Sequence, residues 1–94
     1  MTETQALTVC WLCTRPLGSK VQWHHTVPKA KGGRDTVPVH PICHRTIHAH
    51  FTNAQLSRIG GERRALLASV EVAKFVEWVA SRPPDFYVPT RKAR

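Results

Sequence analysis

The sequence lacks a long apolar run, and this absence excludes several classes of protein. No segment is long and apolar enough to span a bilayer, so we expect no membrane contact. The N-terminal stretch, MTETQALTVC, has neither the basic head nor the apolar run of a secretory signal peptide. We therefore expect a cytoplasmic protein.

Acidic residues are also scarce. Six Asp and Glu stand against fourteen Lys and Arg, which gives a formal net charge of +8 and a pI near 10.3. An excess of this size is typical of proteins that bind a polyanion, most often nucleic acid. The alternative is a basic protein without such a partner, because charge selects a class of partner and names no function.

The chain is too short for a large hydrophobic core. Its 94 residues, 41% of them apolar, allow one domain, which we expect to span residues 1–94. Domains of this size often depend on a metal ion or on disulfides for their stability. Three cysteines cannot all pair with one another, so a metal site is the simpler expectation.

Two short motifs supply the ligands for such a site. A C-x2-C motif at residues 10–13 offers two thiolates, and an H-x2-C motif at residues 40–43 offers one imidazole and one thiolate. Four nitrogen and sulfur ligands form the closed shell that structural Zn²⁺ prefers, and binding adds folding free energy. The alternative is that the cysteines are small buried hydrophobes. The predicted zinc ligands are Cys10, Cys13, His40 and Cys43, with His44 and His50 as substitutes for His40.

The chain divides into a Cys/His-rich half and a helical half. Residues 9–51 are punctuated by Pro and Gly, residues 52–82 follow a helical pattern, and residues 83–94 form a basic tail. A loose leader is expected at residues 1–8. No repeat or low-complexity segment interrupts this order.

The first half is expected to form a strand, a loop, a second strand and a helix. Residues 21–24 and 37–40 are predicted to pair as antiparallel strands across a loop rich in Lys, Arg and Gly. Pro41 is favoured in the first turn of a helix, so the run CHRTIHAHF that follows is expected to be helical.

The second half carries start and stop signals for three helices. Thr52 and Gln55 fit a capping box, and Gly60 with the glycine after it ends the first helix. A short second helix is expected at about residues 62–68. Ser69 is placed to cap the third, in which apolar residues recur at helical spacing until a proline pair ends it.

The remaining histidines suggest a second, different metal site. His44 and His48 are four residues apart on the expected helix, so both rings lie on one face and can hold one ion. A third imidazole from the preceding strand would complete the set and leave positions open for water and substrate. Each histidine alone is more typical of an ordinary surface or core residue.

These motifs resemble those of a known family. C-x2-C, then HH-x2-P-x3-GG, then VPVH-x2-CH-x3-H is similar to the HNH endonucleases of the zinc-knuckle type. The match covers Cys10 to His48, and the helical remainder is similar to the C-terminal part of small stand-alone bacterial HNH proteins. The resemblance implies a small α+β fold: a ββα-metal (treble-clef-like) HNH core with a structural zinc, followed by C-terminal helices.

The resemblance also implies a role for each histidine. His24, His44 and His48 would ligate a catalytic divalent metal, and His25 would be the general base. The implied reaction is hydrolysis of a phosphodiester, leaving a 5′-phosphate and a 3′-hydroxyl, with the imidazole taking a proton from water near neutral pH. Imidazole suits Mn²⁺, Co²⁺, Ni²⁺ or Zn²⁺ better than Mg²⁺, so we expect Mn²⁺, Co²⁺ or Ni²⁺ to support cleavage at least as well as Mg²⁺.

The sequence departs from the family pattern at two positions. The family's Asn, shortly before the second motif, has no counterpart, and Asp35 or Thr36 falls nearest in a shorter stretch. That Asn normally ties the loop to the strand bearing the base, so the position of His25 depends on its replacement; Asp35 is our catalytic candidate for that place. The second motif begins with His40 where Cys is commoner.

Basic and aromatic residues are the candidates for substrate contact. Trp11 and Trp23 have rings that can stack on bases, although we expect them to pack in the core, as we do for Trp78. Basic residues of the helical half and the tail are expected to be solvated. Those expected to contact phosphates, which position the backbone without reading sequence, are Lys29, Lys31, Arg34 and Arg45.

Together these motifs predict a metal-dependent endonuclease that acts on DNA, with RNA as the alternative substrate. One rival is a non-catalytic, zinc-stabilised module that binds nucleic acid. Another is a nuclease component that needs a partner protein. Four histidines at metal and base spacing favour the enzyme over the binding module, because docking needs none of them. The oligomeric state is left open.

Overall fold

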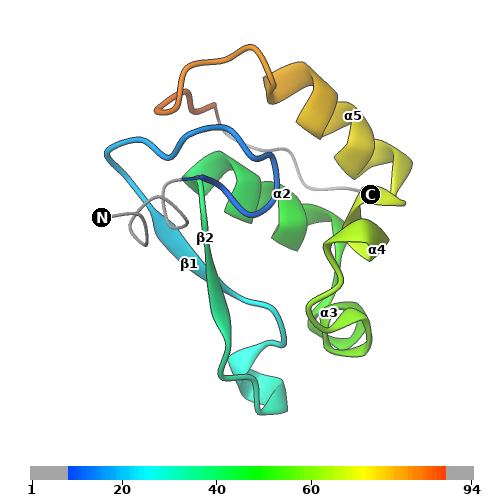
Figure 1. Cartoon of the computed structure of the whole chain (residues 1–94). Coiled ribbons are helices and arrows are strands. Elements are labelled where there is room, and N and C mark those ends of the chain that lie inside the picture. The colour runs from blue at the N-terminus through cyan, green and yellow to red at the C-terminus, as the bar shows by residue number, and fades with distance from the viewer. Residues whose placement is uncertain (1–8, 89–94) are drawn as a thin grey trace.

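The computed structural model describes residues 9–88 and has the predicted small α+β architecture. Its elements follow the expected order of strand, loop, strand and helix, and then three further helices (Figure 1). The predicted leader and the end of the predicted basic tail (89–94) lie outside the described residues. The elements are β1 (Gln22–His25), the 3-10 helix η1 (Lys29–Lys31), β2 (Thr36–Val39), α2 (Pro41–His50), α3 (Asn53–Ile59), α4 (Arg63–Leu67) and α5 (Val70–Val79).

The two strands form an antiparallel hairpin with η1 at its tip (Figure 1). The predicted pairing is confirmed, with each strand one residue from its predicted position, β1 later and β2 earlier. His24 pairs with Val37 in this register. β2 ends at Val39 because His40 is the N-cap of α2, with φ −67° and ψ 148°.

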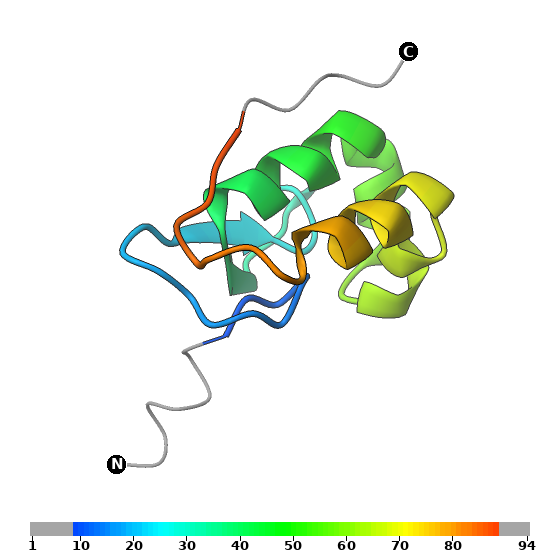
Figure 2. The same cartoon turned by 90° about the horizontal axis from the view of Figure 1, so that it is seen from above.

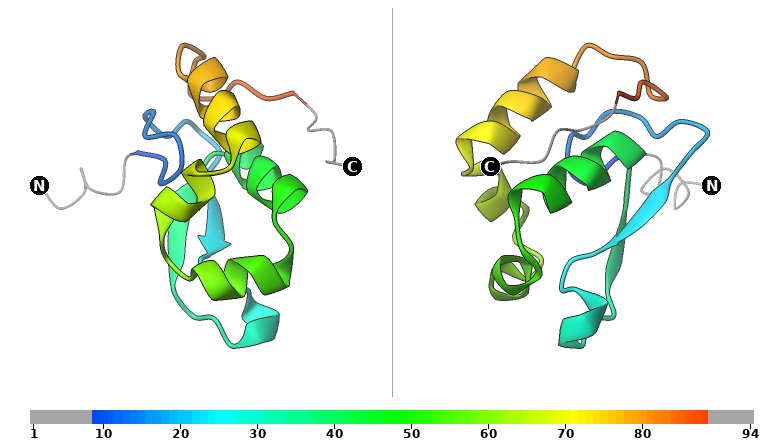
Figure 3. Two further views of the ribbon diagram at one scale, coloured as in Figure 1. Left: turned by 90° about the vertical axis from the view of Figure 1, so that its right-hand side faces the viewer. Right: turned by 180° about the vertical axis from the view of Figure 1, so that it is seen from behind.

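Helix α2 contacts both β1 and α5, so it joins the two halves of the chain. The views in Figure 3 show α2 and α5 side by side, with the hairpin on the other side of α2. Pro41 stands at the start of α2, where its missing N–H would have no helical partner in any case. The residues that α2 buries recur at helical spacing and are Ile42, Cys43, Thr46 and Ile47.

The predicted helix caps of the second half are confirmed. The Thr52 hydroxyl accepts from the Gln55 N–H at 3.1 Å, and the Gln55 side chain accepts from the Thr52 N–H at 2.8 Å. Gly60 ends α3 at φ 64°, in the left-handed region that favours glycine. The Ser69 hydroxyl caps α5 by accepting from the Val72 N–H at 3.3 Å. No helix among residues 9–88 is long and apolar enough to cross a membrane.

The prediction that Trp78 lies in the core was wrong. Helix α5 buries Val72 and Val79, and Trp78, one position before Val79, lies about 100° around the helix from it. As a result 44% of its surface remains exposed. The Arg82 guanidinium lies over its ring, 5.0 Å from the centroid. Helix α5 also ends at Val79, before the predicted stop at the proline pair that begins at Pro83.

Candidate functional site

The four predicted zinc ligands come together in the core. Cys10 and Cys13 lie in a tight loop closed by the Val9–Pro16 bridge, while His40 caps α2 and Cys43 lies in its first turn. All four side chains are buried, and their ligand atoms lie within 4.8 Å of one another. These residues therefore lie close enough together to hold a metal ion.

The orientation of His40 fits a ligand in this Cys3His cluster. Its Nε2–H donates to the Pro16 carbonyl at 2.8 Å, which leaves a lone pair on Nδ1. Nδ1 lies 3.4 Å from the Cys13 sulfur and 3.8 Å from the Cys43 sulfur. The ring is thus held in the tautomer that coordination through Nδ1 requires.

The crowding of the three thiols also fits a cation among them. Contact with the thiols of Cys10 and Cys13, together with burial, raises the pKa of Cys43. The pKa of Cys13 is lowered because the thiols of Cys10 and Cys43 donate hydrogen bonds to it. All three can ionise together only if a positive charge lies between them, and three thiolates with one neutral imidazole form a set that Zn²⁺ prefers.

Arg15 is a contributor to this cluster that sequence reasoning missed. Its Nε donates to the Cys13 sulfur at 3.3 Å, and its Nη1 donates to the carbonyls of Arg82 and Pro83 at 3.0 and 2.7 Å. Only 7% of its surface is exposed, which is rare for an arginine without several partners. Its position two residues after Cys13 was the one signal in the sequence.

A second cluster forms from three of the predicted histidines. His24 extends from β1, and His44 and His48 lie one turn apart on α2. The ring centroid of His24 lies 5.3 Å from the centroid of His44 and 5.3 Å from that of His48. The centroids of His44 and His48 lie 4.8 Å apart. One ligand atom from each lies within 4.8 Å of the others. The structure therefore brings these imidazoles close enough to share one ion.

His24 shows why an ion suits this histidine cluster. The ring is 1% exposed, is stacked on Trp11 at 5.9 Å, and its Nδ1 has no hydrogen-bond partner among residues 9–88. Burial, with the nearby charges of His44, His48 and His25 as smaller causes, lowers its pKa to about 4. A buried nitrogen left without a partner costs roughly 1–3 kcal/mol. Coordination of a cation by the neutral ring would remove that cost.

Gln22 orients the second member of the cluster and was also missed. The His44 Nδ1–H donates to Gln22 Oε1 at 2.8 Å, so Nε2 carries the lone pair that a metal would need. Burial, followed by the charges of His48 and His25, lowers the pKa of His44, and burial lowers that of His48. Side chains two apart on a strand share a face, so the spacing from Gln22 to His24 was a usable signal.

His25 opens into the same pocket as two of these histidines. A pocket of about 330 Å³ lies between the hairpin tip, α2 and the start of α3. His24 is not among its lining residues. Of the basic residues predicted to contact phosphate, this pocket contains Lys29. The lining residues are Trp23, His25, Pro28, Lys29, Ala30, His44, His48 and Asn53.

The two tryptophans near the site differ in their packing. Trp11 packs against the core as expected. For Trp23 the expectation of core packing was wrong, because 53% of its surface is exposed at the edge of the histidine pocket. Side chains alternate along a strand, so Trp23 points to the face of β1 opposite to the buried His24, and its ring lines the histidine pocket without packing in the core.

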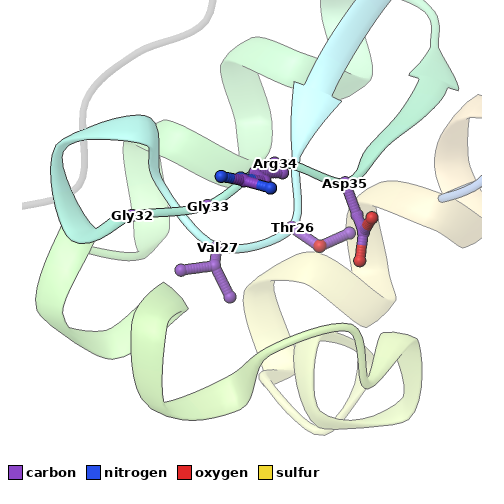
Figure 4. A pocket seen from close by; sticks show the side chains of 6 residues that line it. All are labelled: Thr26, Val27, Gly32, Gly33, Arg34 and Asp35. Atoms are coloured by element: carbon purple, nitrogen blue, oxygen red, sulfur yellow. The ribbon is translucent and has the colours of Figure 1, made fainter.

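Asp35 lies in a separate pocket of about 320 Å³ beside η1 (Figure 4). Its backbone carbonyl accepts from the Thr26 N–H at 3.2 Å, which ties the loop to the residue after His25. A Cβ at position 33 would collide with the Val27 carbonyl, so Gly33 permits this close turn. The tether expected from an Asn side chain is thus made here by main chain.

The other predicted phosphate contacts are spread around the hairpin and α2. Lys31 is exposed on η1, and Arg34 lines the pocket that contains Asp35 (Figure 4). Arg45 is exposed on α2 and lines a third hollow. Thr36, the alternative to Asp35, pairs with His25 in the sheet. Only Lys29 shares the histidine pocket among these four basic residues.

Comparison with known proteins gives one informative relationship. No family model matches the chain, and no solved structure matches it. The chain is 38% identical over 90 residues to "Uncharacterized protein YisB" of Bacillus subtilis (strain 168), a match that covers 90% of this chain and 86% of that protein. At this identity and coverage, the chain belongs to the same protein family as YisB.

Proposed function

We propose that the protein is a metal-dependent HNH endonuclease that hydrolyses phosphodiester bonds in DNA. The observation that carries the proposal is that His25 opens into the same pocket as His44 and His48. A set of metal ligands beside a further imidazole is what metal-assisted hydrolysis needs, since one part binds the ion and the other moves a proton. The hairpin–helix order and the Cys3His cluster support the resemblance drawn from the sequence.

In this proposal His25 is the general base. As water attacks phosphorus, His25 accepts one of its protons; the new P–O bond forms while the bond to the 3′ oxygen breaks. The products are a 5′-phosphate and a 3′-hydroxyl, which takes its proton from solvent. A divalent ion held by His24, His44 and His48 would supply charge stabilisation for the phosphoryl and leaving oxygens. Lys29 lines the same pocket and is placed to contact a phosphate.

The Cys3His cluster is assigned a structural role. Four protein ligands close the coordination shell of Zn²⁺ and leave no position for water or substrate. The cluster joins the N-terminal loop to the start of α2, the helix that carries His44 and His48. For Asp35 the proposal is a positional role through its backbone, because its side chain lies outside the histidine pocket.

The rival binding module is disfavoured by the buried Nδ1 of His24. A protein that only docks on DNA has no use for an imidazole nitrogen without a partner in its interior, where each such group costs stability. A metal-binding site, in contrast, uses such a nitrogen to coordinate the ion.

The proposal is tested by incubating the protein with supercoiled plasmid over Mn²⁺, Co²⁺, Ni²⁺, Zn²⁺ and Mg²⁺. We expect nicking or cleavage by the parent protein, and a loss of roughly 10²- to 10⁴-fold in rate for His25→Ala. His50→Ala is the matched control, because His50 is a half-buried histidine of α2 outside both clusters. Equal rates for His25→Ala and the parent protein would leave the binding module as the better account.

A further inference from the structure

A groove of about 820 Å³ lies between the segment that leads into β1, the first turns of α2, and the segment after α5. Figure 2 shows the segment after α5 running back past the N-terminal end of α2 and the loop before β1. We call this hollow the C-terminal groove. The residues of its lining that matter here are Lys20, Gln22, Arg45, Asp85, Phe86 and Tyr87.

The wall that the segment after α5 contributes is anchored at several points. The Ser19 N–H donates to the Asp85 carboxylate at 2.8 Å, and a Cβ at position 18 would collide with that carboxylate, so Gly18 permits the approach. The Phe86 ring packs edge-on against Trp78, with centroids 5.5 Å apart. The groove is therefore a preformed feature of the fold.

Two cations and an aromatic ring face the groove. Lys20 and Arg45 are exposed, and 47% of the Tyr87 surface is exposed. The one acidic residue of its lining, Asp85, is engaged by the Ser19 N–H. Positive charge next to an uncovered aromatic face is the combination that holds the phosphate and the base of a nucleotide together.

The C-terminal groove adjoins the histidine pocket. Gln22 lines the groove, and its Oε1 accepts from His44, which lines the pocket. Arg45, in the groove, is the residue that follows His44 on α2. A polynucleotide has one phosphate per nucleotide, so a strand with one phosphate at His44 can offer the next to Arg45.

We propose that the C-terminal groove binds an unpaired nucleotide of the DNA strand that is cut, next to the scissile phosphate. This inference rests on the proposed nuclease function and adds that the substrate is unpaired next to the cleavage site. A base within a duplex is covered by its neighbours on both faces, so only a base that is single-stranded, frayed or bulged can lie against Tyr87. The protein is therefore expected to prefer such DNA over a fully paired duplex.

The test measures binding by fluorescence anisotropy in the full-length His25→Ala protein, which retains the groove. Tyr87→Ala is expected to weaken binding of a labelled single-stranded oligonucleotide about 5- to 10-fold, the low end of the range for one stacked base because Tyr87 is half exposed. Tyr87→Phe keeps the ring and is expected to bind as the parent does. Arg45→Gln should reduce the slope of log K against log salt by about 0.7, as expected for one lost phosphate contact. Arg58→Gln, an exposed arginine of α3 outside the groove, serves as the charge control.

Several results would overturn the inference. One is unchanged single-strand affinity for Tyr87→Ala; another is an equal loss for a blunt duplex. Tighter binding of single-stranded RNA of the same sequence would reject the assignment to DNA. Cleavage assays with His25 intact keep the two proposals apart. If the protein cuts plasmid, but the Tyr87→Ala variant binds single-stranded DNA as the parent does, only the proposed nucleotide site in the groove is refuted. If the protein never cuts, the proposed nuclease function is refuted.

Discussion

Replacing Gln22 by leucine is expected to weaken metal binding at the histidine cluster about tenfold. The change removes the Oε1 acceptor that holds the His44 Nδ1–H at 2.8 Å and so fixes which ring nitrogen carries the lone pair. Partners of this kind typically contribute about 10- to 100-fold to metal affinity. The Gln22–His44 bond is solvent-exposed, so water can take the place of the lost acceptor, and the low end of that range applies.

The assay is calorimetric titration of Co²⁺ or Mn²⁺ into protein whose Cys3His cluster has already been loaded with zinc. A tenfold weakening corresponds to about 1.4 kcal/mol. Gln22→Glu is the matched control, since it keeps an oxygen at the same place and is expected to bind the ion at least as tightly as the parent. Nitrogen-15 NMR of the His44 ring provides a second readout, because the leucine variant should lose its single tautomer. Unchanged affinity in Gln22→Leu would refute the orienting role of Gln22.

Three further predictions concern stability. Removing zinc with a chelator should unfold the domain, which circular dichroism during zinc removal measures; an unchanged melting curve would contradict a structural metal. Cys43→Ser should cost more stability than His40→Ala, because the ion loses a charged thiolate in the first variant and a neutral imidazole in the second. His24 has a folded pKa of about 4, below the 6.5 of the free ring, so the unfolded chain binds more protons between these values. Stability should therefore rise as the pH is raised from about 4 to 6.5, and be lost as the pH is lowered through that window, by up to about 3 kcal/mol. Denaturant unfolding without metal at the histidine cluster should therefore show a shallower pH dependence for His24→Gln, and identical slopes would refute the burial argument. Arg15→Gln should lower the free energy of unfolding by about 3 kcal/mol, because buried carbonyls lose a charged donor; a urea midpoint equal to that of the parent protein would argue against it.

Local signals explain why much of the fold could be predicted from sequence. Pro41, the Thr52 capping box and Ser69 act on the residues next to them, and the helices start where these signals place them. The Cys3His cluster was predictable for the same reason, since two short motifs with a fixed gap each supply a pair of ligands. Its geometry needed only that the two motifs meet.

The contributions that were missed depend on distant parts of the chain. Arg15 is buried because it reaches the carbonyls of Arg82 and Pro83, beyond the end of α5, and no local sequence pattern predicts that contact. Trp78 and Trp23 remain 44% and 53% exposed, and how far each ring is covered depends on the packing of distant segments. Gln22 was predictable in part. Strand alternation places it on the same face as His24, but its hydrogen bond to His44 depends on how α2 packs against β1.

Helix α2 holds residues of both clusters at consecutive positions, Cys43 and His44. A single residue inserted between them would turn everything after it by about 100° around the helix axis. His44 and His48 would then swing away from His24 together, even with the Cys3His cluster intact. This segment therefore has no tolerance for a change in length, and relatives that differ in length are expected to carry the extra residues in the η1 loop or beyond His50.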